Sequence, residues 1–171
     1  MTKMTRSIFF VFFIFFISCS KNEIEKEEEG ISINDVLPSL DLILSDGRVI
    51  NDEELTDKVS LILLFNVECR DCQQQIPILK QVYNQVKNND NVILFGISRA
   101  QGQAVVEEYW QRENITFPYS AQDDNTVYLK FAKSIVPRIY IADKDRIVRF
   151  TSTDNPLASY DDLLSIIESL N

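Results

Sequence analysis

An apolar run followed closely by two cysteines constrains this chain more than any other stretch. Residues 60–65 read Ser-Leu-Ile-Leu-Leu-Phe, which has the length and composition of a buried strand. Cys69 and Cys72 follow, separated by two residues. Apolar residues then recur at helical three- and four-residue steps, at Ile76, Leu79, Val82, Tyr83 and Val86. We therefore expect the two thiols where a buried strand turns into a helix, and the free N–H groups and dipole of that helix end favour a thiolate.

The composition excludes several kinds of chemistry. The 171 residues contain no histidine, which rules out Ser-His-Asp and Cys-His catalysis and most catalytic zinc sites. A zinc site on Cys69 and Cys72 would need two further ligands, so we expect neither a metal nor another cofactor. The net charge of −9 and the lack of a basic stripe argue against nucleic acid as a partner.

The first residues have the features of a targeting segment. Lys3 and Arg6 precede a run over residues 8–17 that contains only Ile, Val and Phe and is too short to span a bilayer. The Ser18-Cys19 step that follows resembles a bacterial lipobox. This predicts a signal peptide over residues 1–18, a lipid-modified Cys19 and an oxidising compartment. Ordinary secretion with a free Cys19 remains the alternative.

Residues 19–30 are expected to form a lipidated, acidic tether. Five glutamates lie among few apolar residues there, so the segment cannot bury enough surface to become ordered. An acidic stretch after a lipobox cysteine also resembles the surface-export signals of some Bacteroidetes lipoproteins. We expect a protein of the cell envelope, lipid-anchored to a bacterial membrane and facing the periplasm, or exported to the cell surface.

Residues 31–171 are expected to form one domain. The predicted order is a hairpin (40–44 and 48–50), a polar connection (51–57), the buried strand and the helix with the dithiol, a strand (91–98), a helix (101–113), an extended stretch (117–119), a short helix (125–132), a second hairpin (138–142 and 146–150) and a last helix opened by Asn155-Pro156. Tyr109, Trp110 and Tyr128 are assigned to the core. This alternation predicts an α/β fold with a mixed central sheet, helices on both faces and an added N-terminal hairpin.

Three motifs carry a resemblance to a known family. They are Cys69-Arg70-Asp71-Cys72, the Pro77 that follows in the helix, and Ile135-Val136-Pro137 before a strand. From about residue 31 to 170 the chain resembles the thioredoxin-like, membrane-tethered thiol–disulfide oxidoreductases of the TlpA-like group. The resemblance implies a thioredoxin-like fold and a thiol–disulfide oxidoreductase that reduces protein disulfides. It also implies an upstream membrane donor that supplies the electrons.

The resemblance also implies roles for individual residues. Cys69 is expected to attack a substrate disulfide, and Cys72 to resolve the mixed disulfide that results. Pro137 is expected to be cis and to face the dithiol. The backbone of Val136 is expected to pair with the substrate chain beside the sulfur, as in strand addition.

Three residues depart from the family pattern and are expected to tune the acidity of the attacking thiol. Glu68 stands where relatives usually have an aromatic residue, and its carboxylate disfavours a neighbouring thiolate. Arg70 could counter that charge if its side chain folds back. Gln75 stands where many relatives have a buried carboxylate, and an amide cannot titrate.

Two other functions remain as alternatives. A peroxiredoxin-like thiol peroxidase of this fold carries Thr or Ser three residues before its reactive cysteine and Pro four residues earlier, where this chain has Asn66 and Ile62. A redox-inactive binding lipoprotein with a vestigial dithiol is the second. A purely structural disulfide is disfavoured, because so small a loop stabilises little.

Overall fold

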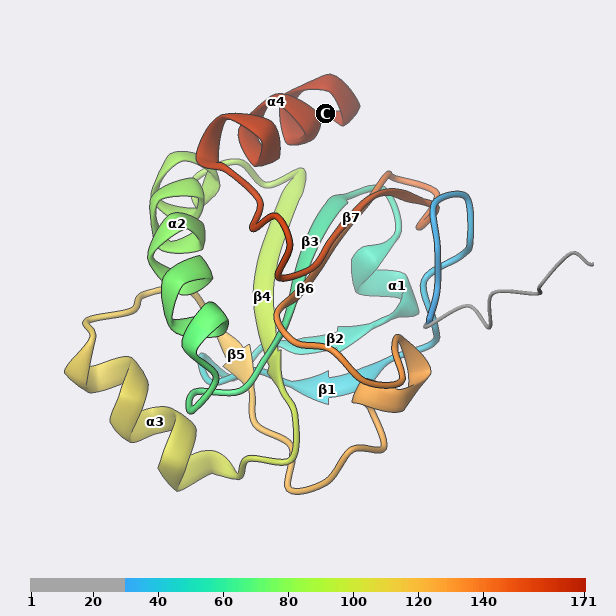
Figure 1. Cartoon of the computed structure of the whole chain (residues 1–171). Helices are drawn as coiled ribbons and strands as arrows, with labels where there is room; N and C mark the ends of the chain where they lie inside the picture. Colours follow the sequence, from blue (N-terminus) through green and yellow to red (C-terminus); the bar gives the residue numbers. More distant parts are fainter. Residues whose placement is uncertain (1–29) are drawn as a thin grey trace, which may run out of the picture.

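The computed structural model describes residues 30–171, so the predicted signal peptide, Cys19 and most of the tether lie outside the described residues. Its centre is a five-stranded sheet with the order β5-β4-β3-β6-β7 (Figure 1). The strands are β3 (Val59–Phe65), β4 (Val92–Ser98), β5 (Tyr119–Ser120), β6 (Arg138–Ala142) and β7 (Val148–Ser152). β3 runs parallel to β4 and antiparallel to β6, so the sheet is mixed.

β3 occupies the middle of the sheet because all of its side chains except that of Ser60 are apolar. All seven of its residues are buried. Leu61, Leu63 and Phe65 face one hydrophobic cluster, whereas Ile62 and Leu64 face a second cluster on the other side. A strand buried on both faces reads as a nearly continuous apolar run, which is how it could be recognised in the sequence.

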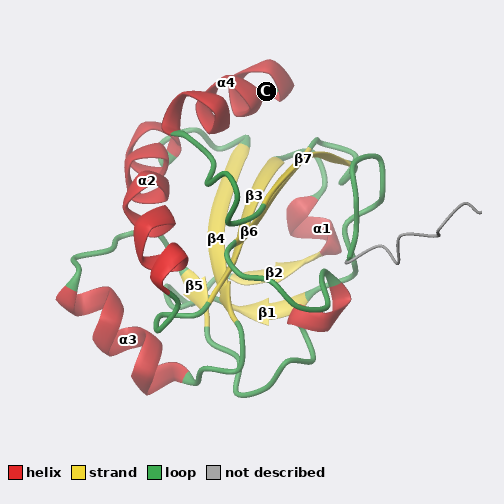
Figure 2. Ribbon diagram, viewed as in Figure 1, coloured by secondary structure: helices red, strands yellow, loops and turns green. Residues whose placement is uncertain are grey.

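The two clusters are covered by different elements (Figures 1 and 2). On one side lie α2 (Arg70–Val86), α3 (Gln103–Arg112) and α4 (Tyr160–Leu170). On the other lie the antiparallel hairpin β1 (Asp41–Ile43) and β2 (Val49–Asn51), α1 (Asp52–Leu55) and the 3-10 turn η1 (Tyr128–Lys130). The predicted fold, a thioredoxin-like α/β domain with an N-terminal hairpin, is therefore confirmed. Tyr109, Trp110 and Tyr128 are buried as expected.

Within residues 30–171, no helix has the length and apolar composition that crossing a membrane requires.

Several element boundaries differ from the prediction: α3 is shorter than the predicted 101–113, β5 lies at Tyr119–Ser120 rather than 117–119, and only the 3-10 turn η1 forms within the predicted helix 125–132. Three further differences are explained by local hydrogen bonds. Residues 52–55 form α1 rather than a polar connection, because the side chain of Asn51 caps it by accepting from the N–H of Glu54. β7 begins two residues later than expected, since Asp143 accepts from the N–H groups of Asp145 and Ile147 and extends the turn.

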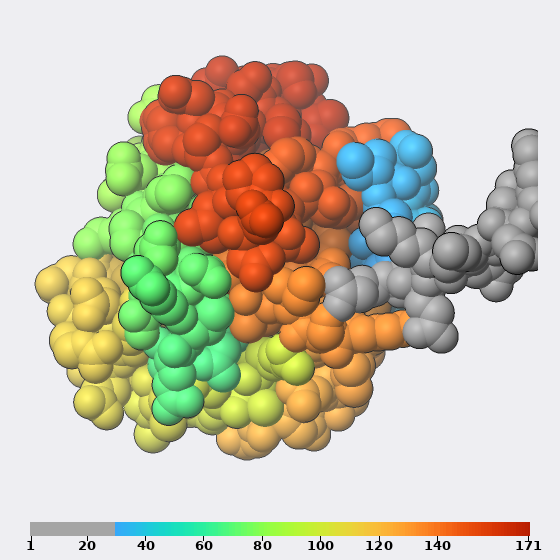
Figure 3. All heavy atoms as spheres, viewed as in Figure 1, coloured from blue at the N-terminus to red at the C-terminus, as the bar shows by residue number. Residues whose placement is uncertain are grey.

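The last helix also starts later than expected. α4 begins at Tyr160, because Ser159 caps it by accepting from the N–H of Asp162. The segment from 153 to 159 instead forms a loop, and Figure 3 shows this red-orange stretch packed beside the green α2. The side chain of Gln75 in α2 makes two hydrogen bonds to the backbone of Ala158 in this loop.

Candidate active site

The two cysteines lie at the amino end of α2, as the sequence predicts. Cys69 is the N-cap residue, with extended backbone angles, and its thiol is half-buried. Cys72 lies in the first turn of the helix and is fully buried. Both are free thiols, so the structure shows the reduced dithiol. The site thus pairs one accessible sulfur with one that solvent does not reach.

Burial raises the pKa of the Cys72 thiol far above its ordinary value. The backbone N–H of Asn66, 3.5 Å from its sulfur, opposes that shift, while a hydrogen bond with Cys69 adds to it. Cys72 is therefore a neutral thiol at physiological pH in the reduced protein. Its sulfur can become a nucleophile only when a base takes its proton, whereas the Cys69 sulfur is accessible from solvent.

The thiol of Cys69 meets the segment that precedes β6. Its S–H donates to the backbone carbonyl of Val136 at 3.4 Å, across 67 positions of sequence. The Val136–Pro137 peptide bond is cis, as the family resemblance implied. The structure thus brings together Cys69, Cys72, Val136 and Pro137, the four residues assigned to exchange and substrate pairing.

A groove of about 390 Å³ opens beside the accessible sulfur. It is lined by Asn66, Glu68, Cys69, Arg99, Ala100, Asn125 and Val136. These residues come from the loop after β3, the loop after β4, the segment between β5 and η1, and the segment before β6. A peptide placed in this groove would lie against both the Cys69 sulfur and the Val136 backbone.

The three residues expected to tune the thiol occupy different surroundings. Glu68 and Arg70 are exposed, and the N–H of Glu68 donates to the side chain of Asn66 at 2.8 Å. Gln75 is fully buried in α2. Its Nε2–H donates to the carbonyl of Ala158 and its Oε1 accepts from the N–H of the same residue, both at 3.0 Å. Their influence on Cys69 remains a prediction.

The family model that matches this sequence is the one described as the AhpC/TSA family, over residues 33–151. The chain belongs to the AhpC/TSA family. A search of curated proteins by sequence gives no match. Within residues 30–171, which the structure describes, no group of three or more His, Cys, Asp or Glu side chains is placed to hold a metal ion.

Solved structures share the fold at low sequence identity. The thioredoxin domain of a thiol-disulfide oxidoreductase from Bacteroides vulgatus is 18% identical with a TM-score of 0.69, over 82% of this chain and 99% of that one. A thiol:disulfide interchange protein from Chlorobium tepidum is 18% identical with a TM-score of 0.69, over 82% of this chain and 98% of that one. A secreted disulfide oxidoreductase from Mycobacterium tuberculosis is 16% identical with a TM-score of 0.66, over 77% of this chain and 96% of that one.

Sequence reasoning missed the residues that support the loop before Cys69 in this AhpC/TSA chain. The Val67 peptide is bound on both sides by glutamine side chains. Its N–H donates to Oε1 of the buried Gln101 at 2.7 Å, and its carbonyl accepts from Nε2 of Gln73 at 2.8 Å. Gln73 directly follows Cys72, and its position in the first turn of the predicted helix is the one feature of the sequence that could have marked it as a support of this loop. Gln101 is 34 positions away from Val67, and no local pattern marks it.

Proposed function

We propose that this protein is a thiol–disulfide oxidoreductase that reduces disulfides of proteins in the cell envelope. One observation carries the proposal: a half-buried thiol at the amino end of a helix contacts the backbone carbonyl that precedes Pro137, with a second, buried thiol one turn away. This arrangement offers a substrate chain both a nucleophile and a strand edge. The likeness to thiol–disulfide oxidoreductases in fold supports the same reaction class.

The exchange proceeds in two balanced steps. The Cys69 thiolate attacks one sulfur of the substrate disulfide, the substrate S–S bond breaks, and the released thiolate takes up a proton. Cys72 then loses its proton and attacks the Cys69 sulfur. The second substrate thiolate leaves, and an intramolecular disulfide remains. The substrate gains two electrons and the dithiol loses two, so turnover requires a dithiol reductant, for which we propose a membrane electron donor.

The buried thiol accounts for the order of the two steps. The high pKa of Cys72 keeps it protonated while Cys69 attacks, so the two sulfurs do not compete for the substrate. Val136 offers its backbone to the substrate chain once Cys69 has turned towards the incoming disulfide. We further propose that residues 1–18 are removed, that Cys19 is lipidated, and that residues 19–30 tether the domain to the membrane. If Cys19→Ala leaves membrane association unchanged, this anchoring is wrong.

Membership of the AhpC/TSA family favours one second candidate, a thiol peroxidase. That reaction would need a group beside Cys69 to bind and polarise a peroxide. Asn66, three residues earlier, directs its side chain to backbone groups instead: it accepts from the N–H of Glu68 and donates to the carbonyl of Arg99 at 3.5 Å. Ile62 is buried in β3. We therefore rank disulfide reduction first.

One pair of assays separates these functions. The protein should reduce insulin disulfides with dithiothreitol as electron donor and should consume hydrogen peroxide no faster than the Cys69→Ser variant does. Cys72→Ser should accumulate a mixed disulfide with substrate through Cys69, because the resolving thiol is gone. Peroxide consumption without insulin reduction would establish the peroxidase, and inactivity in both assays would establish a binding protein.

A further inference from the structure

Three consecutive carbonyls before β6 are each bound by a side chain from elsewhere in the chain. Nη1 of Arg99 donates to the carbonyl of Ser134. The hydroxyl of Tyr128 donates to the carbonyl of Ile135 at 3.1 Å. The third carbonyl, that of Val136, accepts from the Cys69 thiol at 3.4 Å. The segment that is proposed to pair with substrate therefore depends on side chains for its position next to the sulfur.

The first two of these side chains also support each other. The guanidinium of Arg99 lies over the ring of Tyr128, 4.5 Å from its centroid. A cation so placed is attracted by the ring, and the contact limits the orientations that the arginine can adopt. Tyr128 itself is almost completely buried, so it is a rigid platform for the arginine. The pair behaves as one unit with two donors, aimed at neighbouring carbonyls.

The backbone of Arg99 connects this unit to the nucleophile. Its N–H donates to the carbonyl of Phe65, the last residue of β3, at 2.7 Å. Its carbonyl accepts from the side chain of Asn66 at 3.5 Å. Arg99 thus contacts the chain that leads to Cys69 and also the loop that carries Val136. A change in either contact would alter the separation between sulfur and loop.

We infer that Arg99 and Tyr128 are positioning residues that hold the loop 134–136 in register with the Cys69 sulfur, and that they favour disulfides embedded in an extended peptide over small disulfides. The inference rests on the proposed function. A peptide that pairs with the Val136 backbone reaches the sulfur correctly only when the loop is fixed. A small disulfide has no chain to pair and needs only the thiolate. Loss of Arg99 should therefore affect the two substrates differently.

The test compares two substrates and matched variants. Arg99→Met keeps the length of the side chain but removes its donors and its charge. It should raise the KM for insulin about three- to tenfold, the range expected for losing one or two hydrogen bonds, and leave kcat within about twofold. Any loss of rate with hydroxyethyl disulfide should be much smaller than the loss with insulin, because Arg99 lines the groove but a small disulfide does not pair with the loop 134–136. Arg99→Lys, which can still donate to Ser134, should restore most of the loss.

Two further variants keep the test decisive. Tyr128→Phe removes only the hydroxyl that binds Ile135, and it should raise the insulin KM without changing the hydroxyethyl disulfide rate. Arg112→Met removes an exposed arginine that also lies over a tyrosine, 5.0 Å from the ring centroid of Tyr109, and should behave as wild type. It controls for net charge and for the loss of arginine–tyrosine stacking.

The outcomes distinguish this inference from the proposed function. A wild-type protein that does not reduce insulin contradicts the function itself. A wild type that does, with both Arg99→Met and Tyr128→Phe unchanged in KM, contradicts the positioning role alone. Equal losses on insulin and hydroxyethyl disulfide would also overturn it, because they would show general damage to the dithiol. If Arg99→Met does not fold, Tyr128→Phe and Arg99→Lys decide by the same comparison.

Discussion

Replacing Gln75 by glutamate is expected to make the stability of the fold depend on pH. In the wild type, the fully buried amide donates to the carbonyl of Ala158 and accepts from its N–H, both at 3.0 Å. A protonated carboxyl group has nearly the same shape, and its O–H can replace the amide N–H. A carboxylate has no donor, so it would face the Ala158 carbonyl with a second acceptor in a site that water does not reach.

The size of the effect follows from this environment. Burial and the facing carbonyl both favour the neutral acid, so the introduced carboxyl should have a folded pKa well above the ordinary ~4.3 of glutamate. A rise of about two to three units, within the range known for buried glutamates, corresponds to about 3–4 kcal/mol. Because the folded state holds the proton more tightly, the variant should match wild type below about pH 4. It should then lose stability as pH rises to the folded pKa, with no further loss above it.

Urea unfolding of the reduced proteins at pH 4, 6 and 8 measures this directly. Gln74→Glu is the matched control, because Gln74 is the exposed neighbour on the same helix. Relative to wild type, the control should be nearly independent of pH over this range, whereas the free energy of unfolding of Gln75→Glu should fall by about 3–4 kcal/mol between pH 4 and 8. The reasoning is refuted if Gln75→Glu follows the control, or if it is least stable at pH 4.

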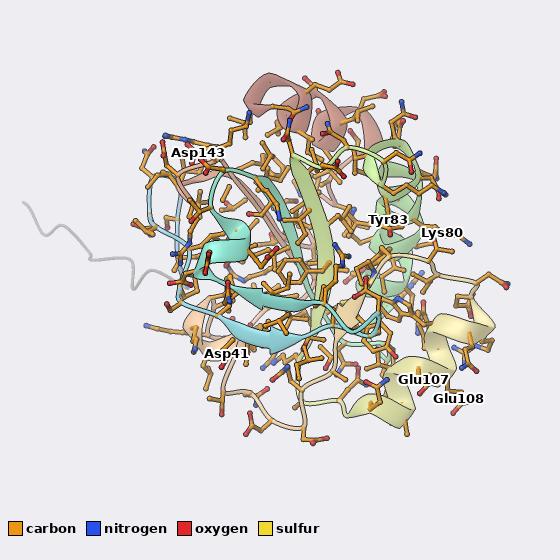
Figure 4. All side chains as sticks on the ribbon, turned by 180° about the vertical axis from the view of Figure 1, so that it is seen from behind. Asp41, Lys80, Tyr83, Glu107, Glu108 and Asp143 are labelled. Carbon is orange, nitrogen blue, oxygen red and sulfur yellow. The ribbon has the colours of Figure 1, made fainter. Side chains whose placement is uncertain are left out.

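Two smaller effects are also expected. Glu68→Gln should raise the reduction potential of the dithiol by about 5–20 mV, measured by equilibration with glutathione, because removing an exposed negative charge stabilises the Cys69 thiolate. A lower potential would contradict this. Asp143, labelled in Figure 4, lies in the turn before β7. Burial acts to raise the pKa of its carboxyl, but the N–H of Ile147 and the guanidinium of Arg149 together hold that pKa below its usual range. Asp143→Ala should therefore lower the free energy of unfolding by about 1–2 kcal/mol at pH 7. The difference from wild type should shrink as pH falls below about 4 and through the low folded pKa of Asp143, which urea unfolding at pH 7 and 3 measures.

The sequence was most informative where one face or both faces of an element are uniformly buried. β3 and β4 could be recognised from continuous apolar runs, and α2 from its helical period, because burial selects the residue type at every inward position. The dithiol could be placed at the end of β3 for the same reason. α1 could not be recognised, since a four-residue helix with one buried side chain, Leu55, has no period to detect.

The supports of the candidate site could not be predicted, because each is a pairing between distant positions. The sequence shows that Gln75 is an amide that cannot titrate, but its two hydrogen bonds to Ala158 join residues 83 positions apart. Arg99 has no sequence signal as a ligand of Ser134, 35 positions later. Glutamine and arginine side chains are also common on protein surfaces, so the sequence alone does not mark these two as buried or paired. The folded chain shows that their donors bind backbone carbonyls.

The directions of three strands explain why these pairings gather at the dithiol. β3 and β4 are parallel and end together, with Phe65 opposite Ser98, so the loops that follow them emerge at the same edge of the sheet. β6 is antiparallel to β3 and has Arg138 opposite Leu64, so the segment before it arrives at that edge from the other side. In an α/β sheet the carboxyl ends of the strands are where ligand sites form. Cys69, Arg99 and the loop 134–136 are therefore neighbours by topology. Side-chain hydrogen bonds then set the distances between them, and those distances are what the Arg99 and Tyr128 variants would change.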